Sequence, residues 1–172
     1  LNLEKCVFSV PAGKLLGFIV SGRGIEANPS KIRALSQLGI PKDLKQIQKL
    51  TGCVAALSRF ISRLGEKALP LYRLLRCTKH FEWTDAATAG LEEIKAILAT
   101  NPVLAAPNLG EPMLLYIVAT HQVVSAVLVV ERETEGHKFP LQKPVYYVST
   151  VLTPCKSRYP HYQKIAYAVF MA

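Results

Sequence analysis

Side chains that could hold a catalytic metal are few in this sequence. It contains only two aspartates, Asp43 and Asp85, and each stands where a segment of helical spacing begins. A carboxylate at a helix start accepts hydrogen bonds from backbone N–H groups, so both are predicted to have this local role. Two-metal chemistry on phosphate esters needs several carboxylates gathered at one place. Two separated aspartates do not provide that site.

The glutamates do not provide such a site either. No Asp or Glu occurs between residues 112 and 130, or from residue 136 to residue 172. Glu131, Glu133 and Glu135 lie close together, but at the predicted tip of a hairpin. The four cysteines lack metal-ligand spacing and are predicted to be reduced thiols of an intracellular protein. No metal or other cofactor is therefore expected in this chain.

Positive charge is concentrated in the first half of the sequence. The formal net charge is +9, and residues 1–80 contain 14 Lys and Arg against 4 Asp and Glu. Residues 81–172 contain 7 against 8. This asymmetry favours a polyanionic partner, most commonly nucleic acid; a solvated basic surface without a partner is the alternative. No stretch reaches the roughly 18 apolar residues of a membrane span, so no membrane partner is expected.

The first part of the chain predicts two strands followed by helices. Residues 5–10 and 14–20 predict a hairpin across a Pro-Ala-Gly turn, with Gly17 marking a bulge or a close backbone approach in the second strand. Asn28, followed by proline, predicts the start of a helix that Gly39 ends.

Three further helices are predicted before residue 101. Asp43 predicts the N-cap of a helix whose apolar residues recur at spacings of three and four as far as Ile61. Residues 69–75 predict a short helix, and Thr84 predicts the cap of another over residues 86–99.

The second part changes to strand patterns. Residues 113–119, 124–131 and 144–149 predict three strands, and residues 161–172 predict a helix after a turn region. Three consecutive strands followed by a helix favour an antiparallel meander with the helix on one face. The predicted fold class is therefore α+β.

Several segments, in this order and spacing, resemble the polymerase region of Ty3/gypsy-type retrotransposons, with wording nearest the plant Tat and Athila branches. They are residues 5–8 (KCVF), 16–20 (LGFIV), 24–32 (GIEANPSKI), 50–52 (LTG), 57–61 (LSRFI), 81–84 (FEWT), 144–149 (PVYYVS) and 158–160 (RYP). The match extends over nearly the whole chain.

The resemblance implies three regions. Residues 1–27 would be the end of a reverse transcriptase palm, carrying the primer-grip hairpin, and residues 28–80 a helical thumb. Residues 81–172 would be an RNase H-like or connection module, truncated at its C-terminus. Both ends resemble cuts in a longer polyprotein, with the palm upstream and an RNase H or integrase downstream as covalent partners. The family implies an intracellular location, in a cytoplasmic virus-like particle.

The resemblance also implies which residues contact nucleic acid, either an RNA–DNA hybrid or a template–primer duplex. The hairpin residues Leu16, Gly17 and Phe18 would form the primer grip. Basic residues of the predicted thumb helix would follow the phosphate backbone through electrostatic contacts that do not depend on sequence. These residues are Lys42, Lys45, Lys49, Arg59 and Arg63.

The RNase H-like module departs from the family at two acidic positions. In the family an Asp on the first strand and a Glu on the first helix bind Mg²⁺, and here Val118 and Ile165 occupy the matching positions. The parent enzyme is expected to use Mg²⁺, whereas this fragment is expected to grip nucleic acid without cutting it. Two alternatives remain: an active RNase H acting on RNA–DNA hybrids, and a host-captured interaction domain without a nucleic-acid role.

Overall fold

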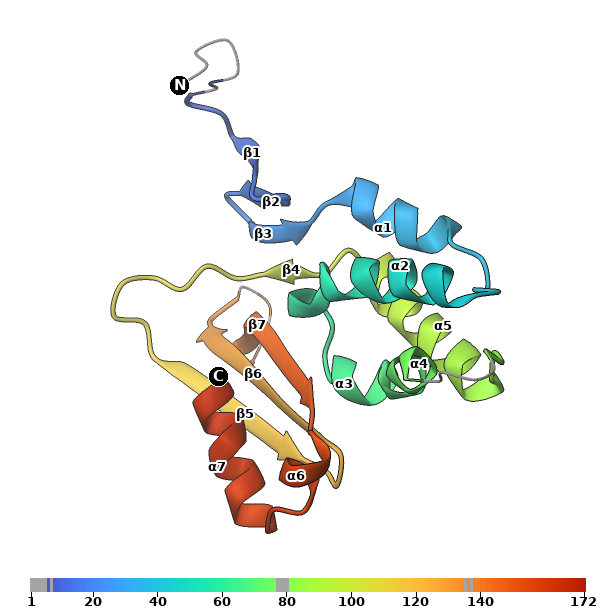
Figure 1. Ribbon diagram of the computed structural model, residues 1–172. Coiled ribbons are helices and arrows are strands. Elements are labelled where there is room, and N and C mark those ends of the chain that lie inside the picture. The colour runs from blue at the N-terminus through green and yellow to red at the C-terminus, as the bar shows by residue number, and fades with distance from the viewer. Residues whose placement is uncertain (1–5, 7, 77–80, 135, 137) are drawn as a thin grey trace.

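A computed structural model describes residues 6, 8–76, 81–134, 136 and 138–172 (Figure 1). The first half contains β1 (Ala12–Leu15), β2 (Phe18–Ser21), β3 (Gly24–Ala27), α1 (Pro29–Gln37), α2 (Leu44–Ala55), the 3-10 helix η2 (Ser58–Phe60), α3 (Leu64–Lys67) and α4 (Leu69–Leu75). The second half contains α5 (Asp85–Ala99), β4 (Val103–Leu104), β5 (Met113–Ala119), β6 (Val123–Arg132), β7 (Leu141–Val151), α6 (Pro154–Ser157) and α7 (His161–Met171).

The N-terminal hairpin forms with a different turn from the predicted one. Its strands are β1 and β2, and Leu15 pairs with Phe18 across a two-residue turn. Leu16 and Gly17 both have positive φ, 49° and 83°, which is the turn that matches the twist of paired strands. The strand predicted over residues 5–10 is therefore wrong for its described residues 6 and 8–10; residues 5 and 7 lie outside the described part.

Side-chain caps set the helix starts as the sequence predicts. Asn28 Oδ1 accepts the N–H of Ser30 at 3.0 Å, and Asp43 Oδ1 accepts the N–H of Gln46 at 2.8 Å. Thr84 caps α5 in the same way through the N–H of Ala87. Each cap contributes about 1 kcal/mol of stability by satisfying a backbone donor that the helix leaves free.

The helix that begins at Leu44 is shorter than predicted. It ends at Ala55, although the apolar residues beyond it, including Leu57 and Ile61, are buried. The chain continues through η2 into α3. The spacing of apolar residues therefore predicted the burial of Leu57 and Ile61 correctly, but wrongly predicted one continuous helix. A turn of 3-10 helix keeps side chains at i and i+3 on one side while the chain changes direction.

One hydrophobic core joins the helices, including α5. Ile47, Val54, Ile61 and Ile94 are completely buried in it, and Leu104 of β4 is among its members. β4 extends the first sheet by pairing antiparallel with β3, so that sheet has the order β1-β2-β3-β4. Residues 81–84, between α4 and α5, form no strand. The division of the chain at residues 27 and 80 stays a prediction.

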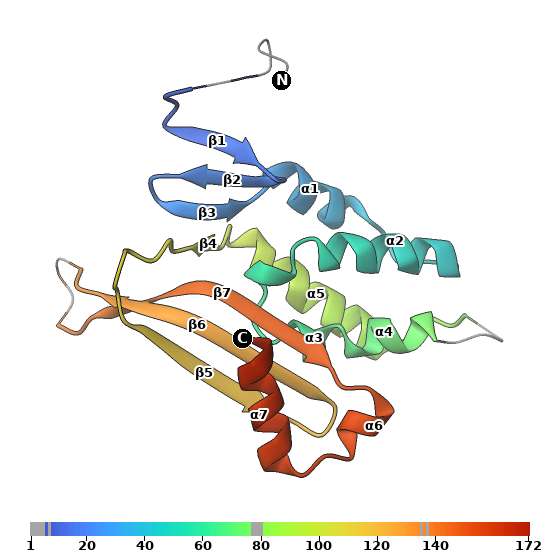
Figure 2. The same cartoon turned by 60° about the vertical axis from the view of Figure 1, so that its left-hand side comes forward.

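The second sheet confirms the predicted meander. Its order is β5-β6-β7, all antiparallel, and α7 covers one face of it (Figure 2). Val124, Leu152 and Ala168 form the small core between this sheet and α7. The short helix α6, capped by Thr153, occupies the predicted turn region. No helix in the described residues is long and apolar enough to cross a membrane.

The helical body and the second sheet are joined by polar contacts at close range. The N–H of Gly65 donates to Ser149 Oγ at 2.8 Å, and the two hydroxyls of Ser125 and Ser149 lie 2.6 Å apart. The N–H of Ala105 donates to the carbonyl of Pro144 at 2.7 Å. These bonds satisfy polar groups that the packing would otherwise bury without partners.

Gly90→Ala is expected to destabilise the protein by about 1–3 kcal/mol, because a Cβ at this buried position in α5 would lie 2.2 Å from the carbonyl oxygen of Lys67. Gly52→Ala, in α2, is the matched control: no atom lies within 4 Å of its Cβ position, so it should stabilise by up to about 1 kcal/mol. Urea unfolding measures both. Equal stability of the two variants would contradict the described packing of α5 on α3.

Candidate nucleic-acid interface

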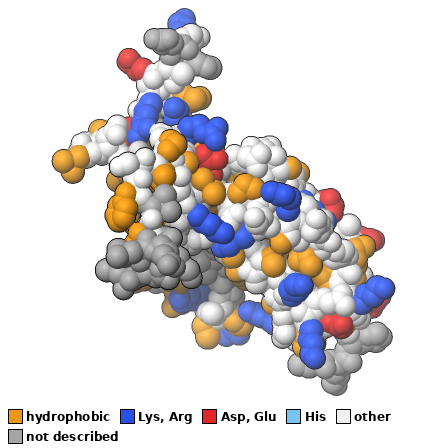
Figure 3. Space-filling view, turned by 90° about the horizontal axis from the view of Figure 1, so that it is seen from above, with side chains coloured by type: hydrophobic (Ala, Val, Ile, Leu, Met, Phe, Trp, Pro, Cys, Tyr) orange, Lys and Arg blue, Asp and Glu red, His pale blue; other side chains and the backbone are white. Residues whose placement is uncertain are grey.

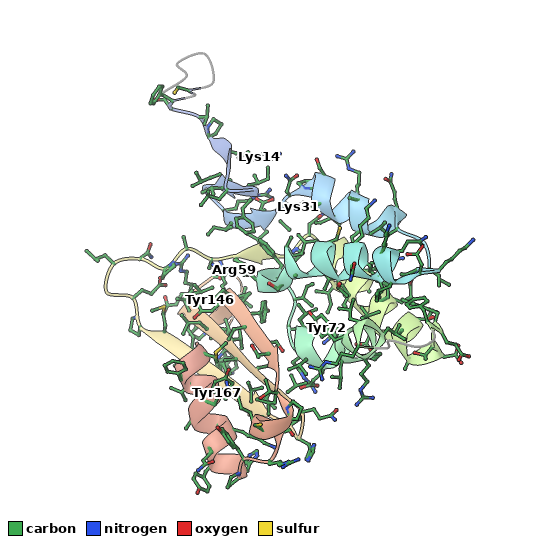
Figure 4. All side chains as sticks on the ribbon, viewed as in Figure 1. Lys14, Lys31, Arg59, Tyr72, Tyr146 and Tyr167 are labelled. Atoms are coloured by element: carbon green, nitrogen blue, oxygen red, sulfur yellow. The ribbon has the colours of Figure 1, made fainter. Side chains whose placement is uncertain are left out.

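The tip of the β1–β2 hairpin is exposed, and the side chain of Lys31 packs against it. Leu16 is 88% exposed. A Cβ on Gly17 would lie 2.9 Å from Lys31 Nζ, so the lysine of α1 lies directly against the turn (Figure 4). The predicted residues Leu16 and Gly17 are thus at the tip, although Gly17 is in the turn itself and not within a strand.

Phe18 has a structural role beside this tip. Its ring packs against the ring of Phe60, with centroids 5.8 Å apart, and Lys31 Nζ lies 5.6 Å from its centroid. The ring therefore anchors the hairpin to η2, and its exposed surface is limited. Lys31 was missed by sequence reasoning. Its position two residues after Pro29, in a predicted helix beside a predicted hairpin, was the only available signal.

The outer face of α2 carries two of the predicted lysines. Lys45 and Lys49 are exposed and lie one turn apart, and the same face continues through Gly52. Lys42 is not part of this helix, contrary to prediction. It precedes the cap residue Asp43, and its N–H donates to Gln46 Oε1 at 3.0 Å.

The predicted arginines lie elsewhere because α2 ends at Ala55. Arg59 is exposed on η2, which packs against β7 (Figure 4). Arg63 has a positive φ of 52° and forms an ion pair with Glu66. The hydrogen bond that Arg63 donates to the Glu66 carboxylate raises the pKa of the Arg63 guanidinium, which stays charged. The structure therefore does not bring the five predicted cations onto one helix face.

Other basic residues surround the tip and the α2 face. Lys14 on β1 and Arg33 on α1 are exposed. Figure 3 shows Lys and Arg side chains spread over the face formed by the hairpin, α1 and α2, with hydrophobic side chains between them. The described part of this face is therefore a distributed basic surface, which suits backbone phosphates better than a single small anion.

No group of three or more His, Cys, Asp or Glu side chains in the described residues could hold a metal ion. Asp43 acts as a helix cap, and Asp85 lies in the first turn of α5. Glu131 belongs to β6, Glu133 follows that strand, and Glu135 lies outside the described part. The acidic residues near the predicted hairpin tip therefore offer no described metal site.

Val118 and Ile165 are not brought together by the fold. Ile117 and Ala119 pack against the core under α7, so strand alternation directs Val118 to the opposite face. There it lines a mostly apolar hollow of about 220 Å³ with Arg63 and Tyr147, whereas Ile165 lies on α7. The identification of these two positions with lost acidic residues stays a prediction.

Residues 83–172 match the family described as the RNase H-like domain found in reverse transcriptase, which is just over half of the chain. The chain belongs to this family. The predicted relationship to retrotransposon Pol polyproteins is thereby confirmed, whereas the finer assignment to the plant Tat and Athila branches stays a prediction.

Similar proteins include transposon polyproteins. The Pol polyprotein of transposon opus from Drosophila melanogaster is 27% identical over 180 aligned residues, covering 98% of this chain and 17% of the relative. The transposon Tf2-3 polyprotein from Schizosaccharomyces pombe is 28% identical over 159, covering 92% and 12%. The chain thus spans less than a fifth of these two relatives.

Two solved structures share the fold. The foamy viral protease-reverse transcriptase in complex with RNA/DNA hybrid aligns with a TM-score of 0.74 and 22% identity, over 93% of this chain and 21% of that one. Its complex with dsDNA aligns with a TM-score of 0.72 and 21% identity, over 94% and 33%. The likeness extends through both the helical body and the second sheet.

The double substitution Val118→Asp with Ile165→Glu is expected not to create a metal site, because the two positions face different sides of the sheet. Both side chains are about 40% exposed, so the chain should still fold. A Mn²⁺ titration followed by thermal unfolding is expected to give the same midpoint shift for the double variant as for each single one. A shift specific to the double variant would show that the two carboxylates converge.

Proposed function

We propose that this chain is the non-catalytic, nucleic-acid-gripping part of a retrotransposon reverse transcriptase, with the helical body acting as thumb. The observation that carries the proposal is the outer face of α2, where Lys45 and Lys49 stand exposed one turn apart on a member of a reverse transcriptase family. Neither lysine forms an ion pair with a described acidic residue. Both are therefore available to phosphates.

The α2 face suits close approach by a duplex. Beyond the lysines it continues with Gly52 and Ala56, which are exposed and add almost no height. A helix that carries cations at one end and small residues at the other can contact one phosphate strand and still allow the duplex to lie against its backbone. Shape and phosphate contacts of this kind do not depend on base sequence.

The hairpin tip offers a second contact on the same part of the chain. The Leu16–Gly17 turn forms the exposed end of the hairpin, and Lys31 beside it supplies a positive charge. In this proposal the turn and Lys31 hold the end of a primer strand, and α2 follows the duplex. The foamy viral protease-reverse transcriptase, which shares the fold, has been solved in complex with RNA/DNA hybrid and with dsDNA.

The second sheet with α7 is proposed to connect this grip to the rest of the polyprotein. Its described residues gather no carboxylate cluster that could hold two Mg²⁺ ions. Cleavage of hybrid is therefore not expected from this chain alone. Any Mg²⁺-dependent polymerase or RNase H activity is proposed for other parts of the parent protein.

Lys45→Gln combined with Lys49→Gln is expected to weaken binding to an RNA–DNA hybrid by roughly tenfold per lysine at about 0.1 M salt. The slope of log affinity against log salt should fall by about 2, because two phosphate contacts are lost. Fluorescence anisotropy over a series of salt concentrations measures both quantities. Recovery of intact hybrid in the presence of Mg²⁺ checks that no cleavage occurs.

Lys138→Gln combined with Lys143→Gln is the matched control, since it removes the same charge from the β6–β7 hairpin region. It should leave the affinity within about twofold of the unsubstituted chain, because those lysines lie outside the proposed grip. An equal loss of affinity in the control would mean that hybrid binding depends only on the net charge of the chain. The proposed grip would then be wrong. Cleaved hybrid would instead favour the active RNase H alternative.

Gly52→Leu is expected to weaken hybrid binding at least about threefold while leaving the chain folded. Its side chain would project from the α2 face into solvent, because nothing lies within 4 Å of the Cβ position. Ala89→Leu places the same side chain on the exposed surface of α5 and should leave binding unchanged. Unfolding midpoints within a few degrees of each other would establish that any difference arises at the interface.

A further inference from the structure

The second sheet has two edge strands, and β7 is the protected one. It carries Lys143 and Pro144, and its register with β6 shifts between Leu128 and Val129. The carbonyl of Pro144 also accepts the N–H of Ala105, and α3 and η2 pack against the strand. Charged residues, prolines, bulges and a covering segment are the features that keep a sheet edge from pairing with another chain. β7 combines all four.

β5, at the other edge of this sheet, has none of these features. Its seven residues, MLLYIVA, include no charged residue and no proline, and its register with β6 is continuous from Met113 to Ala119. Among the described residues it pairs with β6 alone, so the backbone groups on its outer side have no strand partner. Figures 1 and 2 both show β5 at the outer edge of the second sheet, away from α1 and α2.

The side chains of β5 are apolar on both faces of the sheet. Leu114, Tyr116 and Val118 lie on the face opposite α7, whereas Met113 and Leu115 lie on the face that α7 partly covers. All five are between 38% and 48% exposed. A contiguous apolar strip on the surface of a protein marks an interaction site more often than a solvated surface.

The surroundings of β5 are electrically neutral, although the net charge of the chain is +9. No Asp, Glu, Lys or Arg occurs from residue 113 to residue 130, which includes β5 and most of β6. Beside the start of β5, Arg132 donates hydrogen bonds to both carboxylate oxygens of Glu111, at 2.8 and 2.7 Å. A charged partner would find no opposite charge at this edge, whereas a second copy of the chain would meet no like charge there.

We propose that β5 is a self-association surface, at which the β5 strands of two copies of this chain pair antiparallel around Tyr116. In this register each Tyr116 lies opposite the partner's Tyr116. Leu114 lies opposite the partner's Val118 on one face, and Leu115 lies opposite the partner's Ile117 on the other. Every such pair joins two apolar side chains, and pairs of this kind stabilise a sheet. The strand is therefore complementary to itself.

The size of this surface sets the strength of the association. A single pair of seven-residue strands buries less than the roughly 1,200 Å² of a standard interface, so a weak dimer with a Kd on the order of 10 µM is expected. The surface shares no residue with the α2 face or the β1–β2 hairpin. The proposal therefore does not depend on the nucleic-acid grip proposed above.

Sedimentation equilibrium of the whole chain over about 1–200 µM tests the proposal. A monomer–dimer equilibrium is expected that persists or tightens at about 0.5 M salt, because salt screens the repulsion between two chains of charge +9. Tyr116→Lys should weaken dimerisation at least about tenfold, since two like charges would lie directly opposite each other. Phe170→Lys adds the same charge on α7, where the side chain is 83% exposed, and should leave dimerisation unchanged. Circular dichroism checks that both variants fold.

Tyr116→Cys tests the register without weakening the strand pair by charge. The two Cα atoms at position 116 would lie about 4.5–5.5 Å apart, which a disulfide can bridge. Met113→Cys is the matched control, because its two Cα atoms would lie about 20 Å apart. Oxidation should give more covalent dimer than the unsubstituted chain gives only for Tyr116→Cys.

Four outcomes would overturn the proposal. They are a monomer at every concentration, a mass that grows beyond the dimer, association that weakens as salt rises, and dimerisation that Phe170→Lys reduces but Tyr116→Lys does not. Equal crosslinking of Tyr116→Cys and Met113→Cys would overturn the proposed register around Tyr116.

Discussion

The architecture depends on the close approach of α3 to the second sheet at Gly65. A Cβ there would lie 2.7 Å from Val123 Cγ1 and 2.8 Å from Ser149 Oγ, so only glycine allows the contact. The backbone N–H freed by that approach donates to Ser149 Oγ, whose hydroxyl also pairs with that of Ser125. The absence of a side chain at Gly65 and the short hydroxyl side chain of Ser149 thus fix the helical body relative to the sheet.

That junction determines which of the described basic residues face the second sheet and which stay on an open surface. Because α3 lies against β6 and β7, Arg63 faces the sheet and is engaged by Glu66, while Arg73 reaches Gln122. Lys45 and Lys49 are on the side of the helical body that no described sheet covers. The positive charge of residues 1–80 is therefore divided between an open face and a junction. The open face carries Lys45 and Lys49, whereas a hollow of about 470 Å³ lies at the junction, lined by Arg73 and Arg76.

Local signals allowed much of this fold to be predicted from the sequence. Asn28, Asp43 and Thr84 each cap a helix by accepting a backbone N–H from two or three residues further on. Each stands where a polar residue precedes apolar residues at helical spacing, so the sequence predicts it. The meander was predictable from the alternating strand patterns of residues 113–149, and α7 from the apolar residues at helical spacing that follow them. The pairing of β4 with β3 was not, because it joins residues nearly eighty positions apart through only two pairs. The register of the hairpin was predicted wrongly because its turn places Leu16 at positive φ. Residues other than glycine rarely adopt that conformation.

The residues of the candidate site were likewise predictable only where local spacing determines their position. Lys45 and Lys49 were correctly placed because helical spacing alone puts them together, whereas Arg59 and Arg63 depended on a helix that ends early. Val118 shows a further limit, since matching it to a family position says nothing about the face on which it lies. Its neighbours in space are Ser125 and the apolar hollow beside Arg63, on the face of the sheet opposite α7. A branched apolar side chain there extends the apolar lining of that hollow. The face on which position 118 lies is thus set by the strand register of β5 and by the junction with α3, neither of which a match to a family position reports.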